Sequence, residues 1–321
     1  MEGRSQTAGE TIAFESELGR IDALIATSLQ PLDRTRDASL SIRIEADRAP
    51  FATEGWEVLA RSAVIRDGTV VLHDVCTSGF DVRMRASSTS AEFVFRRTRS
   101  HSTLLNAVLP ARGKLIARSA LVQYPAMWWA ATRGRAPVHA AAVRAGEENL
   151  LLIGASGVGK STLVELEAAS SGRAVSDNLC VSDGRTVWGV VEPMRTATGP
   201  GARTSRGRRE RPLPQRMAGF EPDRIVVLRR GDDLEPGTRT CPPAAAARLL
   251  TAGTYMAGEL RRFWPFTATL AAATPTAPAH PPVREVAEAL TDRVPSIEVV
   301  LPDEPGLGIG DLLGSAVTTC V

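Results

Sequence analysis

One octapeptide of this chain has the residue types and spacing of a phosphate-binding loop. Residues 154–161 follow the pattern G-x-x-x-x-G-K-S. In such a loop the backbone N–H groups form a concave anion site, and the following helix adds the partial positive charge of its N-terminus. The Lys160 ammonium would lie against the β- and γ-phosphates of a nucleotide, and the Ser161 hydroxyl would face Mg²⁺. We expect nucleotide phosphates to be bound by Gly154, Ala155, Ser156, Gly157, Val158, Gly159, Lys160, Ser161 and Thr162.

The composition makes Lys160 more informative than a lysine in most proteins. Of 38 basic residues only two are lysines, Lys114 and Lys160, so arginine serves wherever a generic positive charge is enough. A compact ammonium group on a flexible stem suits a phosphate contact. The lysine in the loop therefore indicates a phosphate ligand.

The segments around the loop predict the elements that such a loop requires. The apolar run 150–153 predicts a short buried strand, and residues 162–169 predict a helix with Leu163 and Leu166 at helical spacing. Alternation of strand and helix from residue 138 onward indicates an α/β core. Two further predicted strands carry candidate residues: His139 opens the strand 138–143, and Asp177 lies inside the strand 173–181. The remaining predicted strands are 223–228 and 296–301, and the remaining predicted helices are 244–250 and 282–290.

A β-rich region precedes this core. Short alternating runs separated by turn signals predict an antiparallel sheet, and from residue 102 to 133 the period becomes helical, with breaks at Pro110 and Pro125. We expect packing in a core or an interface, rather than base stacking, for the adjacent Trp128 and Trp129. The expected strands are 40–44, 57–60, 69–72, 81–84 and 92–95, and the expected regions are a disordered 1–12, a β-rich 13–125 with a helical connector, and a core 126–321.

An arginine-rich segment, 199–216, interrupts the core. It contains little that could pack, and we expect a mobile surface loop. It would be either a basic lid that closes on phosphate or on an acidic substrate, or a solvated linker.

The totals argue against several classes of protein. The formal net charge is +2, which gives no bulk field for nucleic acid or membrane binding. The four cysteines are widely spaced and form no metal or disulfide pattern. No apolar stretch reaches the ~18 residues of a membrane span, and the N-terminus lacks the apolar core of a signal peptide. We expect a cytoplasmic protein.

At this point the sequence resembles the HPr kinase/phosphorylase family and its HPr-kinase-like P-loop relatives. In these proteins a histidine leads through a strand hairpin to G-x-S-G-x-G-K-S, followed by a helix, a glycine and a strand with an Asp-Asp pair. The matching pieces here are His139, residues 154–161, Gly172 and the pair Asp177-Asn178. The resemblance covers residues 125–200 well and implies an α/β P-loop core of the HPr-kinase-like type.

The resemblance also implies an activity, that of an ATP- and Mg²⁺-dependent kinase acting on a hydroxyl group. Asp177 would be the base that faces the acceptor hydroxyl, and His139 would hold or tune it, while Lys160 would stabilise the phosphates. Ser161, Asp177 and Glu192 would lie on the metal side. Since the family forms oligomers, a homo-oligomer is one of the open alternatives.

Three departures separate this chain from a true HPr kinase. Asn178 replaces the second acid, and residues 188–195, which include Glu192 and a phosphate-contacting candidate, Arg195, replace the Arg-Gly-Leu-Gly signature. The N-terminal region is also unlike the regulatory domain of the family. A kinase-like relative with another acceptor fits better, such as a peptide or protein serine or a small metabolite, and such relatives occur beside clusters for peptide natural products. A nucleotide-binding regulator without transferase activity and a generic P-loop NTPase stay open.

Overall fold

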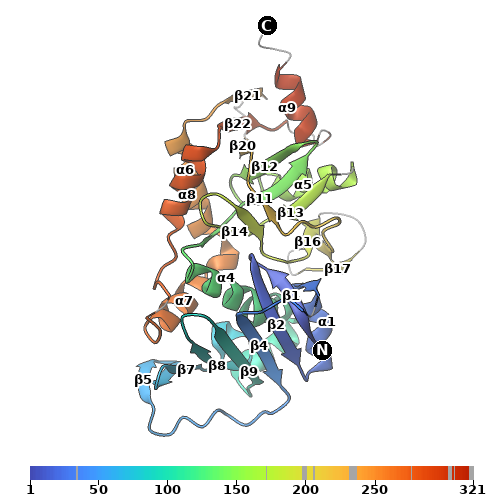
Figure 1. Ribbon diagram of the computed structural model, residues 1–321. Helices are drawn as coiled ribbons and strands as arrows, with labels where there is room; N and C mark the ends of the chain where they lie inside the picture. The colour runs from blue at the N-terminus through green and yellow to red at the C-terminus, as the bar shows by residue number, and fades with distance from the viewer. Residues whose placement is uncertain are drawn as a thin grey trace. The chain divides into compact units, whose positions relative to one another are not determined.

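The chain is a mixed α/β protein that divides into two compact units (Figure 1). The computed structural model describes residues 1–33, 35–170, 172–196, 201–204, 207–230, 237–275, 277–302, 306 and 308–317. The first unit comprises Met1–Gly134, Arg203–Gly207 and Glu259–Pro281, and the second comprises Arg135–Ala202, Arg208–Gly258 and Pro282–Val321. The border predicted between residues 125 and 126 therefore falls inside a helix of the first unit.

Within the described residues, nine strands of the first unit form one sheet, in the order β3-β1-β2-β4-β9-β8-β7-β6-β5. Strand β4 runs parallel to both of its neighbours, β2 and β9, and the other pairs are antiparallel. The sheet is thus mixed, which corrects the antiparallel prediction. Parallel neighbours need long connections, and here residues 17–39 separate β2 from β4 and residues 46–90 separate β4 from β9. The strands are β1 (Glu2–Thr7), β2 (Glu10–Ser16), β3 (Gln30–Leu32), β4 (Leu40–Glu45), β5 (Glu57–Ala60), β6 (Ala63–Arg66), β7 (Thr69–Leu72), β8 (Phe80–Ala86) and β9 (Ala91–Arg97).

Residues 1–12, which we expected to be disordered, form β1 and the beginning of β2. The two strands pair over six residues, and Ile12 is fully buried. The expectation was wrong because it rested on polar side chains, whereas the hydrogen bonds of a strand ladder come from the backbone.

Aromatic packing builds the core of the first unit around α4. Every residue of α4 is buried, including Trp128 and Trp129, as predicted. Trp128 contacts Phe93 of β9 edge to face, with ring centroids 5.5 Å apart, and Phe93 stacks with Phe266 of α7, with ring centroids 6.4 Å apart. The helices are α1 (Gly19–Ala26), α2 (His101–Val108), α3 (Pro110–Arg118), a π-helix (Ser119–Gln123), α4 (Tyr124–Ala131) and α7 (Phe263–Ala271).

Among the described residues, the main sheet of the second unit has six strands in the order β13-β11-β12-β20-β22-β21. Strands β12, β20 and β22 are parallel to one another, β11 and β21 pair with this set antiparallel, and β13 pairs antiparallel with β11. A smaller sheet has the order β10-β14-β15-β19, and β16 pairs with β18. The strands are β10 (Ala136–Val138), β11 (Ala141–Ala145), β12 (Glu148–Ile153), β13 (Arg173–Ser176), β14 (Cys180–Ser182), β15 (Val187–Gly189), β16 (Met194–Thr196), β17 (Ala202–Arg203, at the border of the units), β18 (Arg209–Arg211), β19 (Gly219–Phe220), β20 (Arg224–Arg229), β21 (Gly237–Thr240) and β22 (Ser296–Val300).

The helix that follows the glycine-rich loop, α5, packs on the main sheet and contacts the beginning of α9. Leu163 and Val164 of α5 pack into a core with Leu152 of β12 and Val226 of β20. Where α9 begins, the Gly310 backbone N–H donates to Glu167 of α5 at 2.9 Å. In the described part of the chain, no helix has the length and apolarity that a membrane crossing requires. The helices are α5 (Lys160–Ala169), α6 (Pro243–Met256), α8 (Val283–Arg293) and α9 (Ile309–Val317).

The arginine-rich segment 199–216 differs from the expected mobile loop in its second half. Arg209–Arg211 forms β18 and pairs with β16, and Leu213 is buried in the core of the unit. The Arg211 guanidinium forms an ion pair with Glu165 of α5. The strand pairing and the ion pair hold this part of the segment in place. The prediction of a mobile loop was wrong here because it rested on composition alone. Residues 199, 200, 205 and 206 lie outside the described residues.

Candidate functional site

The predicted phosphate loop connects β12 to α5, as its pattern requires. Gly154, Gly157 and Gly159 have φ values of 150°, 87° and 125°, a region that side chains other than glycine rarely adopt. A Cβ on Gly154 would lie only 2.7 Å from the Leu228 carbonyl oxygen of β20. The glycine spacing thus fits both the turn of the loop and its close approach to the neighbouring strand.

Lys160 is the first residue of α5 and is 5 % exposed. Its Nζ donates to the carbonyl oxygens of Gly154 at 2.8 Å and Ala155 at 3.2 Å. These contacts hold the ammonium group against the backbone of its own loop. A buried cation beside the N-terminus of a helix is an arrangement that binds anions.

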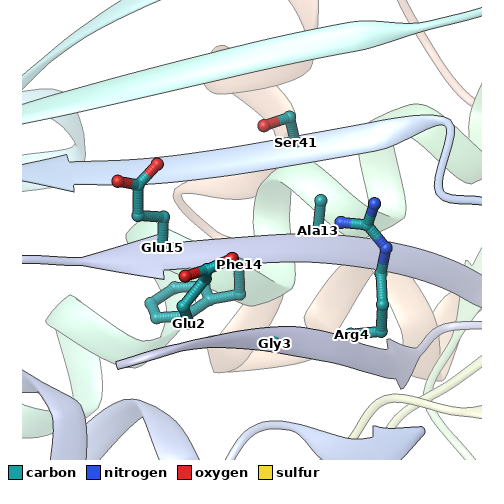
Figure 2. Close-up of a pocket in the computed structure, with 7 residues that line it drawn as sticks. All are labelled: Glu2, Gly3, Arg4, Ala13, Phe14, Glu15 and Ser41. Atoms are coloured by element: carbon teal, nitrogen blue, oxygen red, sulfur yellow. The ribbon is translucent and has the colours of Figure 1, made fainter. Parts of the chain in front are cut away.

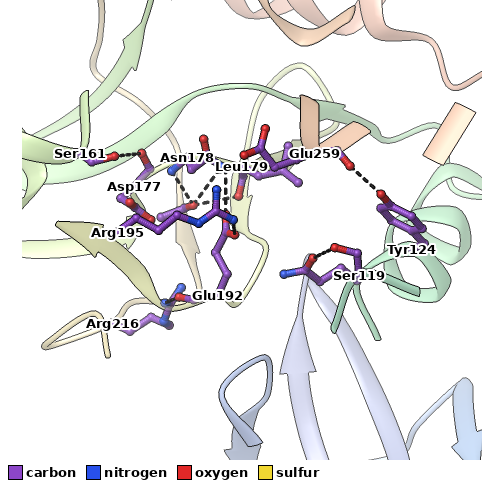
Figure 3. A network of polar contacts seen from close by, with 12 residues as sticks. Ser119, Tyr124, Ser161, Asp177, Asn178, Leu179, Glu192, Arg195, Arg216 and Glu259 are labelled. Atoms are coloured by element: carbon purple, nitrogen blue, oxygen red, sulfur yellow. Dashed lines mark hydrogen bonds and ion pairs between the residues drawn. The ribbon is translucent and has the colours of Figure 1, made fainter. Parts of the chain in front are cut away.

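Asp177 lies in the bend between β13 and β14, which corrects its predicted place inside a strand. The bend is built by Ser176, whose Oγ accepts from the Asn178 N–H at 3.2 Å and the Leu179 N–H at 3.1 Å. Ser161 Oγ donates to the Asp177 backbone carbonyl at 3.4 Å (Figure 3). The bend therefore brings Asp177 to the start of α5.

The Asp177 carboxyl is buried among groups that oppose one another. Burial raises its pKa above the ordinary range, whereas Arg195, the Ser161 hydroxyl and Arg216 act to lower it. The effect of burial is the largest, so the pKa of Asp177 stays above its ordinary value. A carboxylate of this kind accepts a proton more readily than one at the surface, which suits a general base.

Glu192 and Asn178 form a second polar group beside Asp177 (Figure 3). Asn178 Nδ2 donates to Glu192 Oε1 at 3.1 Å, and Arg195 pairs with Glu192 Oε2 at 3.1 Å. An aspartate at position 178 could not donate to Glu192. The departure from the Asp-Asp pair is therefore matched by a partner that needs an amide.

Arg216 is a site residue that the sequence did not reveal. Its Nη2 donates to the Glu192 carbonyl oxygen at 2.5 Å and its Nη1 to that of Val175 at 3.1 Å. Burial lowers its pKa, while Asp177 and Glu192 raise it. Nothing in the sequence distinguishes it from the other arginines of its segment.

His139 lies in the two-residue connection between β10 and β11, so it does not open a strand. Its backbone N–H donates to Thr254 Oγ1 at 2.9 Å, and its Nδ1 lies 3.2 Å from the Gly253 carbonyl oxygen, both on α6. Val138 pairs with Cys180, which places His139 next to the bend that carries Asp177. Its action on the aspartate stays a prediction.

The oxygen donors at the loop fit Mg²⁺. The Ser161 hydroxyl lowers the pKa of the Asp177 carboxyl, and hydroxyl and carboxylate oxygens are ligands that Mg²⁺ accepts beside phosphate and water. Among the described residues, no group of three or more His, Cys, Asp or Glu could hold a metal ion. The predicted metal contact of Glu192 stays a prediction, since this carboxylate is engaged by Asn178 and Arg195.

A hollow on β1, β2 and β4 of the first unit, lined in part by Arg4, Glu15 and Ser41, offers less (Figure 2). Arg4 Nε donates to the Arg36 carbonyl oxygen at 3.2 Å, and Glu15 pairs with Arg43 at 3.0 Å. Arg4 and Glu15 are thus engaged by other groups at the surface. The phosphate loop remains the candidate site.

Comparisons with known proteins add little to this geometry. No protein-family model matches the sequence, and no curated protein matches it. Among solved structures, the chain is similar to the HPr(Ser) kinase/phosphatase from Coxiella burnetii, with 13% sequence identity and a TM-score of 0.31. The match covers 57% of this chain and 88% of that one. A likeness at this TM-score supports no transfer of activity, so the functional argument rests on the residues of the site.

Proposed function

We propose that this chain is an ATP- and Mg²⁺-dependent kinase that transfers a γ-phosphoryl group to a hydroxyl, on a peptide or protein serine or on a small metabolite. The observation that carries the proposal is the contact between the phosphate loop and a buried carboxyl residue. Ser161, the last residue of the loop motif, donates a hydrogen bond to the Asp177 backbone carbonyl at 3.4 Å, and its hydroxyl lowers the pKa of the Asp177 carboxyl. Phosphoryl transfer needs a phosphate cradle and a carboxylate near the incoming hydroxyl; the loop would supply the first and Asp177 the second.

The residues divide the work between binding and proton transfer. The loop N–H groups and Lys160 bind the phosphates and stabilise the charge that develops during transfer. Asp177 accepts the proton of the acceptor hydroxyl, and its raised pKa suits that role. Ser161 and Asp177 would hold Mg²⁺, which supplies further positive charge to the phosphates.

His139 acts on the same bend from the side of α6. With a proton on Nδ1, the ring donates to the Gly253 carbonyl oxygen and presents Nε2 as an acceptor. This fixed ring orientation supports a role in holding or tuning Asp177.

The contact between Asn178 and Glu192 favours a second candidate function. Asn178 is uncharged where the HPr-kinase-like relatives have a second aspartate, so the metal side carries one negative charge fewer. Its amide also engages Glu192. A regulator that binds nucleotide without transferring phosphate would tolerate both changes.

The test measures ATP binding and transfer of radiolabelled γ-phosphate, with Mg²⁺, to pools of serine peptides and of hydroxyl-bearing metabolites. We expect Lys160→Ala to lose nucleotide binding, while Lys114→Ala, which changes the exposed second lysine of the chain, behaves as wild type. Asp177→Ala should keep ATP binding and lose about 10²–10⁴-fold in transfer rate.

Full transfer by Asp177→Ala would contradict the assigned base. Tight ATP binding with no product in any pool would favour the regulator.

A further inference from the structure

A second cation lies beside the phosphate loop, at the end of the strand next to β12. Strands β12 and β20 are parallel, and Ile153 pairs with Val227, so their carboxyl ends reach the same edge of the sheet. There β12 continues into the loop, and β20 continues into Arg230. A Cβ on Gly159 would lie 3.9 Å from Nη2 of Arg230. Ligands of parallel sheets bind at this edge.

Arg230 differs from the other arginines near the site. Its side chain is exposed, and within the described part of the chain it forms no hydrogen bond or ion pair. Its neighbour Arg229 pairs with Glu298 at 3.3 Å, and Arg195 pairs with Glu192. Arg230 therefore has a guanidinium that is available to a ligand in the loop.

We propose that Arg230 is a second phosphate-binding residue, which contacts the polyphosphate of a nucleotide held in the loop. The inference rests on the proposed nucleotide binding. Lys160 is anchored to the carbonyls of Gly154 and Ala155, so it reaches the phosphates from within the loop. Arg230 reaches them from the side of Gly159. The planar guanidinium can donate two parallel hydrogen bonds to phosphate oxygens, which an ammonium group cannot.

The arrangement costs little in the absence of ligand, because an exposed arginine keeps its hydration. Binding a phosphate exchanges that water for charge-assisted hydrogen bonds, which are about twice as strong as neutral ones. Since the side chain stays near solvent, its contribution should weaken as added salt screens it.

The experiment measures the dissociation constants of ATP, ADP and inorganic tripolyphosphate, with Mg²⁺, by calorimetry on the full chain. We expect Arg230→Gln to weaken all three about tenfold, the effect of one charge-assisted contact. Arg230→Lys should lose less. Arg248→Gln is the matched control, because Arg248 is an exposed arginine on α6 that is also without a partner among the described residues.

Unchanged affinities in Arg230→Gln would overturn this inference and leave the proposed function intact. Weaker ATP binding with unchanged tripolyphosphate binding would place the arginine against the nucleoside, and would also overturn it. If wild type binds neither nucleotide, both proposals fail. Circular dichroism verifies the fold of each variant. We expect no change in fold, because every substitution replaces an exposed side chain.

Discussion

At the residue scale, the protonation of Asp177 is set by burial against two arginines. Burial raises the pKa of its carboxyl, and Arg195 and Arg216 lower it without cancelling that effect. The folded state therefore binds the Asp177 proton more tightly than the unfolded chain does. Its contribution to stability is complete at acidic pH and is lost as the pH rises through the raised pKa.

We accordingly expect Asp177→Asn to have a higher Tm than wild type at neutral pH. The two should have the same Tm below about pH 3, where the Asp177 carboxyl is protonated in both the folded and the unfolded chain. The unliganded protein with a chelator is the sample, and thermal unfolding across the pH range is the measurement. Asp292→Asn, an exposed change on α8, should show no such trend. A wild type more stable than Asp177→Asn at neutral pH would mean that the two arginines outweigh burial.

Asn178 allows a second prediction at this scale. In Asn178→Asp a new carboxylate faces Glu192, and we expect a loss of about 1–3 kcal/mol in the free energy of unfolding at neutral pH. Asn178→Ala removes the hydrogen bond and adds no charge, so it should lose less. Urea unfolding at neutral and acidic pH compares them, and the penalty of the aspartate should shrink in acid. Equal stability of the two variants would contradict this account.

At the element scale, the site depends on one strand–loop–helix unit and on the register of the strands beside it. Gly154 touches the end of β20, and Asp177 reaches α5 through the bend after β13. Both contacts involve backbone atoms. A substitution of a glycine, which alters the backbone, therefore tests the position of the loop better than a change of side chain does.

We expect Gly154→Ala to destabilise the protein by about 1–3 kcal/mol, because its φ of 150° strains an alanine and the new Cβ meets the Leu228 carbonyl oxygen. Gly253→Ala is the matched control, since a Cβ there meets nothing within 4 Å inside α6. That change should stabilise by about 0.5–1 kcal/mol. Chemical denaturation of both variants is the measurement. A neutral Gly154→Ala would show that the loop has a different backbone path.

At the scale of the whole molecule, the chain leaves the first unit after Gly134 and supplies it again with Glu259–Pro281. In that segment Phe263 and Phe266 are buried, and both contact Tyr124, with ring centroids 5.6 and 5.9 Å apart. The Tyr124 hydroxyl donates to the Glu259 carbonyl oxygen at 2.6 Å (Figure 3). The first unit is thus discontinuous in sequence.

A fragment of residues 1–134 should therefore fail to unfold cooperatively, because burial of an aromatic side chain is worth about 3–5 kcal/mol and the fragment loses two. Joining residues 259–281 to it through a flexible linker should restore a cooperative transition. Circular dichroism during urea titration distinguishes the two. A fragment that folds without the segment would show that the aromatic contacts are dispensable.

Sequence reasoning succeeded where the signal was local. The loop, β12, α5, the late strands and helices, and the buried tryptophans lie close to where they were predicted. It failed where polar composition stood in for structure, in residues 1–12 and in Arg209–Arg211, since backbone pairing does not require apolar side chains.

By itself the sequence determined the glycine-rich loop and the position of its lysine, because eight contiguous residues fix that geometry through local backbone conformation. Only the tertiary structure decided what surrounds the loop. Arg216 and Arg230 come from distant segments of an arginine-rich chain, and strand order and register alone bring them to Asp177 and Gly159. Local φ and ψ preferences carry no information about such pairings, since these depend on which strands become neighbours in the sheet.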